Sequence, residues 1–216
     1  IFPPTVAATG TLFSDLLLPA ALATLMLGAL GVLGATTLPR LAAFAGIASM
    51  GTIFVAVSAF TPTATAAALY YLLHSTLAGA MLFLVSDLVA DRRSDTSLRS
   101  ALPPMAQAGL IASLFFLAAI ATAGMPPLSG FLGKLLVLDA MRDQAPLIWS
   151  FVLTSSLVLV LGFARAGSVL FWKVNASDGD VTTHVPEGPA FAAVITLAAG
   201  MIALTVFAGP AMAWME

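Results

Sequence analysis

The chain has 216 residues, of which 60% are apolar and only 8% are charged, and its formal net charge is −2. A soluble domain carries about 25% charged residues, so this composition excludes an ordinary soluble protein and indicates a membrane protein. The absence of cysteine excludes disulfides, thiolate metal sites and thiol redox chemistry. No basic patch suggests a nucleic-acid partner, and we expect no cofactor and no metal.

Five apolar segments are long enough to cross a bilayer, whose hydrocarbon core of about 30 Å requires about 20 helical residues. In chain order they cover residues 12–35, 41–60, 64–90, 147–172 and 191–214. Trp172 and Trp214 end two of these segments, as interfacial anchors do. The sequence begins Ile-Phe-Pro-Pro, without an initiator Met or a signal-peptide n-region, and we therefore expect a fragment of a longer chain.

The stretch 105–141 is too long for one straight span, and Pro126 and Pro127 divide it. Its second piece, residues 129–141, is too short to cross a membrane alone. The stretch is therefore either one discontinuous span or a full span followed by a re-entrant half-helix. Two prolines remove two backbone donors and Gly130 adds conformational freedom, so we predict an unwound break at residues 125–130.

Loop charges are compatible with both alternatives. With one discontinuous span, one side of the membrane carries most of the basic residues, namely Arg40, Arg92, Arg93, Arg99 and Lys173. The positive-inside rule makes that side cytoplasmic and places Arg142 outside. We favour this count because the second piece is short and carries Lys134 and Asp139. The prediction is an all-α, multi-pass helix bundle in the cell inner (plasma) membrane, with about six transmembrane helices of which one is discontinuous.

Lys134 is the most informative residue, because it lies in an apolar helix directly after the predicted break. An ammonium at the centre of the hydrocarbon costs about 2.5–3.5 kcal/mol on insertion scales. A chain tolerates that cost if the charge has a partner, faces water or can lose its proton; snorkelling to an interface is the alternative. Broken helices supply free backbone groups for ion sites inside membranes. Lys134 therefore indicates proton or ion movement across a bilayer.

His74 lies near the middle of the third predicted span, and imidazole exchanges protons readily near neutral pH. We predict that it relays protons together with Lys134, while the alternative is a neutral histidine that joins two helices. Ser75, Thr76 and Ser129 are possible supporting hydroxyls. Two further charges inside predicted helices are weaker candidates: Arg165, which can snorkel or set the charge of a nearby acid, and Asp139, which can reach the interface.

Four stretches resemble a known family. They read Tyr-Tyr-Leu-Leu-His-Ser-Thr-Leu at 70–77, Ala-Gly-Met-Pro-Pro-Leu-Ser-Gly-Phe-Leu-Gly-Lys at 123–134, Gly-Phe-Ala-Arg-Ala-Gly-Ser-Val-Leu-Phe-Trp-Lys at 162–173 and Leu-Thr-Val-Phe-Ala-Gly-Pro at 204–210. The first two resemble the antiporter-like subunits shared by Mrp-type multisubunit cation/proton antiporters and respiratory complex I. The last two resemble the MrpD component of the Mrp type.

The resemblance implies a subunit of about fourteen helices built from two inverted five-helix repeats, of which this chain is the last part. Residues 1–173 would form the second repeat, with five spans, and 174–216 a loop and the closing helix. Lys134 would be the central titratable residue and His74 the relay histidine. The first repeat, which carries a glutamate–lysine pair in the family, is absent. Ser49 stands where many relatives have a histidine.

The resemblance implies a proton-translocating membrane subunit of a multisubunit sodium or potassium/proton antiporter, which is a secondary transporter subunit and no enzyme. Its partners would be the other subunits, membrane lipid, protons and monovalent cations. One alternative is the homologous proton-pumping subunit of complex I. Another is a non-transporting scaffold subunit, in which Lys134 would only satisfy a packing contact.

Overall fold

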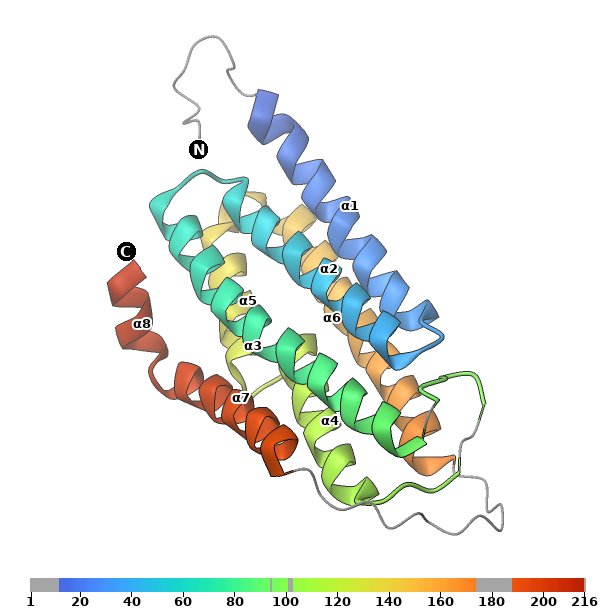
Figure 1. Cartoon of the computed structure of the whole chain (residues 1–216). Coiled ribbons are helices and arrows are strands. Elements are labelled where there is room, and N and C mark those ends of the chain that lie inside the picture. The colour runs from blue at the N-terminus through green and yellow to red at the C-terminus, as the bar shows by residue number, and fades with distance from the viewer. Residues whose placement is uncertain (1–11, 94, 101–102, 174–187, 216) are drawn as a thin grey trace.

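The computed structural model describes residues 12–93, 95–100, 103–173 and 188–215. These residues form eight α-helices and no strand (Figure 1): α1 (Leu12–Gly34), α2 (Leu38–Val57), α3 (Pro62–Arg93), α4 (Ala108–Ala123), α5 (Ser129–Ala140), α6 (Ala145–Gly167), α7 (Gly188–Val206) and α8 (Ala208–Met215). A 3-10 turn, Arg142–Gln144, precedes α6, and a π-helical turn, Ser168–Trp172, follows it. The all-α prediction is confirmed, and the loop expected after residue 173 lies mostly outside the described residues.

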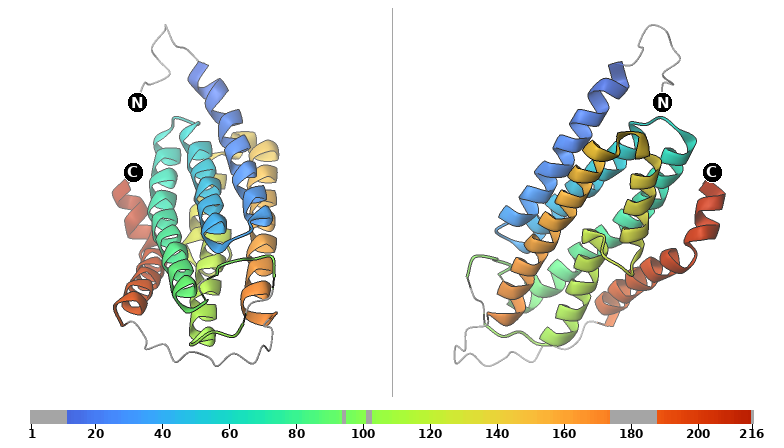
Figure 2. Two further views of the ribbon diagram at one scale, coloured as in Figure 1. Left: turned by 45° about the vertical axis from the view of Figure 1, so that its right-hand side comes forward. Right: turned by 180° about the vertical axis from the view of Figure 1, so that it is seen from behind.

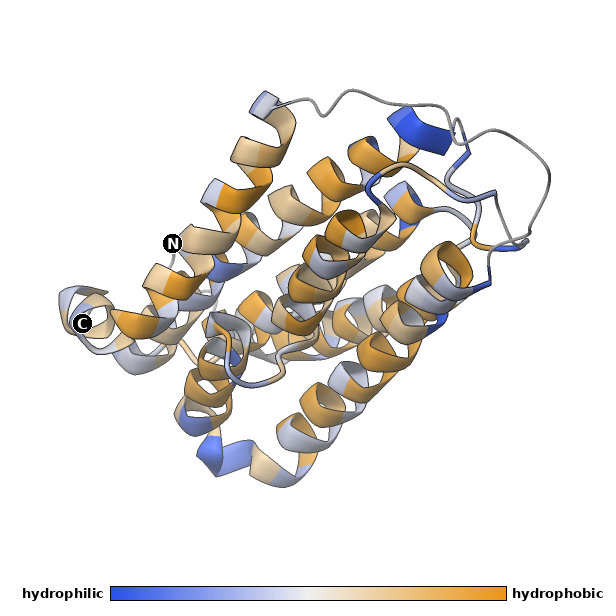
Figure 3. Cartoon of the chain, turned by 90° about the horizontal axis from the view of Figure 1, so that it is seen from below, coloured by the Kyte–Doolittle hydropathy of each residue, from blue (hydrophilic) through white to orange (hydrophobic). Residues whose placement is uncertain are grey.

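The helices run side by side along the bundle, and α8 lies at one edge of it (Figures 1 and 2). The helices α1, α2, α3, α6 and α7 are each long and apolar enough to cross a membrane. The shorter α4 and α5 follow one another along the bundle, and together they lead from the end where α3 stops to the end where α6 starts (Figure 2). The prediction of one discontinuous span is confirmed. Figure 3 shows apolar residues along the helices and hydrophilic residues mainly at their ends.

The closing helix differs from the prediction. The expected single span, 191–214, is divided at Phe207 into α7 and α8, and α8 turns away from the axis of α7 (Figure 1). Pro210 has no N–H to donate to the preceding turn, and its ring clashes with that turn. Gly209 adds freedom next to it. The apolar composition continues through the kink, so hydrophobicity alone gives no sign of it.

Close helix contacts bring the other elements together. Gly28 of α1 lies against the Ala48 backbone of α2, and Gly51 of α2 lies against the Leu25 backbone of α1. Small residues at such positions allow two helix backbones to approach each other. The centre of the bundle is filled by large buried side chains such as Tyr70, Tyr71 and Phe115. Many leucines remain exposed on the outer surface, as expected for helices surrounded by lipid.

At one end of the bundle, arginine side chains form hydrogen bonds between different helices and loops. Arg93 donates to the Leu170 carbonyl at 2.7 Å, and Arg165 donates to the Ala35 carbonyl at 2.6 Å. A short backbone pairing between Thr37 and Ser97 joins the α1–α2 turn to the loop after α3. This is the end that the positive-inside rule assigns to the cytoplasm.

Candidate functional site at the helix break

The break between α4 and α5 begins one residue earlier than predicted. Gly124 ends α4 in the left-handed conformation, with φ 77°, and its N–H donates to the Ala121 carbonyl at 3.1 Å. Pro126 and Pro127 follow, joined by a cis peptide bond, and α5 starts at Ser129. The segment outside the helices is therefore 124–128. Gly130, predicted to loosen the break, lies inside α5 instead.

Gly130 makes room for a close contact. A Cβ atom at this position would collide with the Ala121 carbonyl of α4 and would lie 2.7 Å from Nε2 of His74. The glycine is therefore required for approach rather than for backbone freedom. It brings the start of α5, the end of α4 and the imidazole of α3 together at one point.

Lys134, in the second turn of α5, is only 5% exposed. Its Nζ donates to the Ala123 carbonyl of α4 and to the Ser156 hydroxyl of α6, each at 2.8 Å. The Ala123 carbonyl belongs to the last turn of α4, where carbonyls have no partner within the helix and carry the negative end of the helix dipole. The side chain thus reaches back across the break and caps the preceding half-helix.

Lys134 has no carboxylate partner among the described side chains. The acidic residues among them are all exposed: Asp87, Asp91, Asp95, Asp139 and Asp143. The partners of Nζ are two neutral oxygens, which accept a hydrogen bond from an ammonium and from an amine alike. The site therefore keeps Lys134 in place in both of its protonation states.

His74 of α3 is 1% exposed, and its Nδ1 lies 2.9 Å from the Ser129 hydroxyl at the start of α5. The backbone of Ala121 is its second hydrogen-bond partner. A carbonyl can only accept, so Nε2 carries the hydrogen that faces Ala121, and in the neutral ring Nδ1 accepts from the Ser129 hydroxyl. A protonated ring needs an acceptor at Nδ1, and the same hydroxyl supplies one after rotation. Ser129 can therefore serve both states of the imidazole.

The two titratable side chains converge on the same turn of α4. His74 contacts Ala121 and Lys134 contacts Ala123, two residues apart at the end of that helix. They also lie close enough to each other to interact electrostatically. The broken helix thus brings an amine and an imidazole to the carbonyls of one helix turn inside the bundle.

A row of hydroxyl groups extends this cluster toward α2. The Tyr71 ring is buried beside His74, with ring centroids 5.6 Å apart. Its hydroxyl forms side-chain hydrogen bonds with Ser49 and Thr52 of α2. Sequence reasoning missed Tyr71, although its position three residues before His74 places both on one helix face. It also missed Ser156, because only the packing of α6 against α5 reveals that contact.

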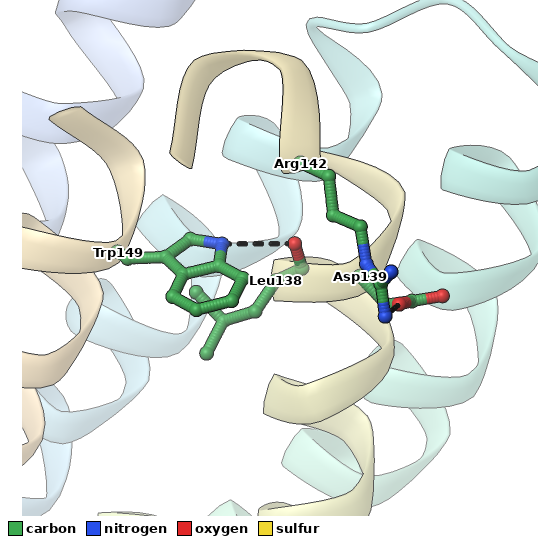
Figure 4. Close-up of polar contacts among 4 residues, drawn as sticks. All are labelled: Leu138, Asp139, Arg142 and Trp149. Atoms are coloured by element: carbon green, nitrogen blue, oxygen red, sulfur yellow. Dashed lines mark hydrogen bonds and ion pairs between the residues drawn. The ribbon is translucent and has the colours of Figure 1, made fainter. Parts of the chain in front are cut away.

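The other predicted supporting residues lie away from the cluster. Ser75 and Thr76 donate to the Leu72 carbonyl of their own helix. Asp139 forms an exposed ion pair with Arg142 near the end of α5 (Figure 4). Arg165 is nine residues beyond Ser156, about 14 Å along α6, and binds the Ala35 carbonyl. No three His, Cys, Asp or Glu side chains gather in the part of the chain that the structure describes, so no metal ligands can be assigned there.

The fold and this site define a multi-pass membrane protein with two buried titratable groups at a discontinuous helix. Residues 2–176 match the family described as NADH:quinone oxidoreductase/Mrp antiporter, transmembrane. The chain belongs to this family.

The chain is similar both to cation/proton antiporter components and to a component of an NADH-quinone oxidoreductase. The D component of the Na(+)/H(+) antiporter of Bacillus subtilis is 26% identical over 175 residues, 81% of this chain and 36% of the relative. The D component of a probable K(+)/H(+) antiporter of Rhizobium meliloti is 27% identical and is matched by 100% of this chain over 45% of its own length. The N component of the NADH-quinone oxidoreductase of Granulibacter bethesdensis is 31% identical over 70% of this chain and 33% of the relative.

Solved structures share the fold. A chain of respiratory complex I from Thermus thermophilus superimposes with a TM-score of 0.84 at 24% identity, over 99% of this chain and 46% of the other. A chain of the Mrp complex from Dietzia sp. DQ12-45-1b gives a TM-score of 0.76 at 23% identity, over 94% of this chain and 46% of the other. The present chain therefore spans less than half the length of these relatives.

Proposed function

We propose that this chain is the proton-translocating part of a membrane subunit in a multisubunit monovalent cation/proton antiporter. The observation that carries the proposal is the convergence of Lys134 and His74 on carbonyls in the last turn of α4. The relatives from Na(+)/H(+) and K(+)/H(+) antiporters support the same interpretation. The other subunits of such a complex, protons and a monovalent cation are the partners that this function requires.

The chemistry uses side chains that can exist in two states. A proton that arrives at Nδ1 of His74 turns the imidazole into an imidazolium, and the Ser129 hydroxyl rotates from donor to acceptor. Lys134 takes up and releases a proton at Nζ while it stays bonded to neutral oxygens. Direct contact between the two groups is unnecessary, since one or two waters can bridge such a gap.

Replacing Lys134 by Ala tests this proposal. In the full-length protein, assembled with its partners in vesicles, Lys134→Ala should reduce cation-dependent proton flux to background. Arg should not restore it, because a guanidinium does not release its proton. Lys173→Ala is the matched control, since it removes an exposed lysine at the cytoplasmic end and should transport normally. Near-normal flux in an assembled Lys134→Ala complex would refute the proposal.

We further propose that residues 1–173 form one repeat unit of five spans and 174–216 a loop and closing helix. The family match, which ends at residue 176, supports this boundary. Deleting the second part from the full-length protein should leave the packing of Lys134 against α4 and α6 intact.

A second candidate function is the homologous membrane subunit of complex I. The 31% identity to the NADH-quinone oxidoreductase component of Granulibacter bethesdensis favours it. Purification of the intact assembly distinguishes the two, because a complex I component would co-purify with NADH-driven quinone reduction. A scaffold role is the third alternative, and it predicts that Lys134→Met keeps full activity.

A further inference from the structure

A groove of about 680 Å³ runs between α5, α6 and α8, on the side of α5 away from His74. Its walls are leucines of α5 and α6, including Leu132, Leu136 and Leu153, together with Ala208, Gly209 and Met212 of α8. Because the chain bends at Phe207, between α7 and α8, α8 forms one wall of the groove without filling it. The walls are apolar except at one end.

The groove has the depth of one membrane leaflet. Along α5 it extends from Leu132, next to the helix break, to Arg142 just beyond the end of the helix. Ten residues of helix measure about 15 Å, half of the roughly 30 Å hydrocarbon core. One end therefore lies near the middle of the membrane and the other at the outer interface.

The outer end carries both signs of charge. Arg142 and Asp139 form an ion pair whose side chains are 73% and 56% exposed (Figure 4). Exposed pairs of this kind are weak, so each member can exchange its partner for a ligand group. Trp149 lies beside them and donates its indole N–H to the Leu138 carbonyl at 3.0 Å, which fixes the ring at the level where aromatic residues meet lipid headgroups.

We propose that this groove binds a phospholipid with a primary-amine headgroup. The acyl chains lie along the leucines of α5 and α6. The phosphate binds the Arg142 guanidinium, whose remaining N–H donors suit phosphate oxygens, and the ammonium binds the Asp139 carboxylate. This arrangement pairs each headgroup charge with the opposite charge at the groove mouth. It also places a lipid on the back of the half-helix that carries Lys134.

The charges at the groove mouth favour a lipid over an apolar protein helix. Arg142 and Asp139 present a guanidinium and a carboxylate at the level of the interface, where a phospholipid carries its headgroup charges. An apolar helix would leave both charges without a new partner.

Native mass spectrometry of the purified full-length protein, with dioleoyl phosphatidylethanolamine and dioleoyl phosphatidylglycerol as probes, tests the proposal. We expect one phosphatidylethanolamine to bind at least tenfold more tightly than phosphatidylglycerol. Leu153→Trp should abolish that binding by filling the groove. Leu161→Trp is its matched control, since Leu161 lies on the same helix, is 52% exposed against 56% for Leu153, and does not line the groove.

Two further variants test the headgroup. Asp139→Asn with Arg142→Gln should remove the preference for phosphatidylethanolamine, whereas Arg99→Gln, an exposed arginine at the opposite end, should keep it. Equal or tighter binding of phosphatidylglycerol to the parent protein would overturn the proposal. So would unchanged lipid binding in Leu153→Trp, or a crosslink that places a partner helix against Leu153.

Discussion

His74 has two hydrogen-bond partners, of which one can only accept and the other can either donate or accept. The Ala121 carbonyl accepts from Nε2 in every state, while the Ser129 hydroxyl can donate to Nδ1 or accept from it. Only the second contact changes when the ring gains a proton. His74→Gln keeps a hydrogen-bonding side chain of similar size but cannot carry a proton. We expect lower antiport and a shifted pH optimum with assembly intact, measured as flux from about pH 6 to about pH 9. Transport like that of the parent across this range would make His74 structural.

Tyr71 and Tyr70 offer a matched pair for testing the hydroxyl row. Tyr71→Phe removes the hydroxyl that meets Ser49 and Thr52, and Tyr70→Phe removes one that donates to the Leu204 carbonyl at 2.9 Å. Each should lower the free energy of unfolding by about 1 kcal/mol, measured by thermal denaturation. Only Tyr71→Phe should also reduce proton flux, by severalfold, because only the Tyr71 ring lies beside His74 and carries its hydroxyl to Ser49 and Thr52. Equal flux in the two variants would confine Tyr71 to packing.

Only those site residues could be predicted from the sequence whose titratable side chains lie inside an apolar helix. A lysine in an apolar half-helix and a histidine in an apolar span are conspicuous, so Lys134 and His74 could be selected, although their roles stay predictions. Hydroxyls are common in membrane helices and mostly bond their own helix, as Ser75 and Thr76 do. The neighbouring sequence does not distinguish Ser75 and Thr76 from Ser129 and Ser156. Ser129 and Ser156 contact titratable residues only because other helices pack opposite them.

At the scale of the elements, Gly130 controls how closely α5 approaches α3 and α4. Gly130→Ala would force its methyl group against the Ala121 carbonyl and Nε2 of His74. Overpacking of this kind costs about 1–3 kcal/mol, and the displaced imidazole should also lower flux. Gly79→Ala, in α3, is the control, because nothing lies within 4 Å of the added atom. Gly130→Ala should have lower thermal stability and lower flux than Gly79→Ala. Equal values in the two variants would show that α5 can move to accommodate the added methyl group.

Helix positions were predictable to within a few residues because span length and apolar composition are local properties. The break was predictable because two adjacent prolines cannot donate to the preceding turn. The kink at Phe207 was missed even though Pro210 causes it, since the apolar run continues through it. The position of Gly130 inside α5 was also missed, because its role is set by contacts with two other helices.

At the scale of the whole molecule, Arg165 joins three segments at the end of the bundle that the positive-inside rule assigns to the cytoplasm. It joins α6 to the end of α1 through the Ala35 carbonyl and to the loop after α3 through the Leu98 carbonyl at 3.4 Å. Arg165→Gln should lower the free energy of unfolding by about 1.5–3 kcal/mol, the usual value for hydrogen bonds to a charged group. Flux per folded complex should be unchanged. Arg40→Gln, an exposed arginine at the same end, should have little effect on thermal stability; loss of flux without loss of stability in Arg165→Gln would instead assign it to transport.

The position of the helix break has an electrical consequence. α4 has 16 residues and α5 has 12, so these half-helices are about 24 Å and about 18 Å long, and Nζ of Lys134 lies where they meet. A proton that travels to this amine from either face crosses about half of the membrane voltage. Since a full crossing is worth about 2.3 kcal/mol per 100 mV, each 100 mV changes the protonation equilibrium about sevenfold. On the function proposed above, a voltage that is negative inside would favour protonation of the amine from the outside and its deprotonation toward the cytoplasm.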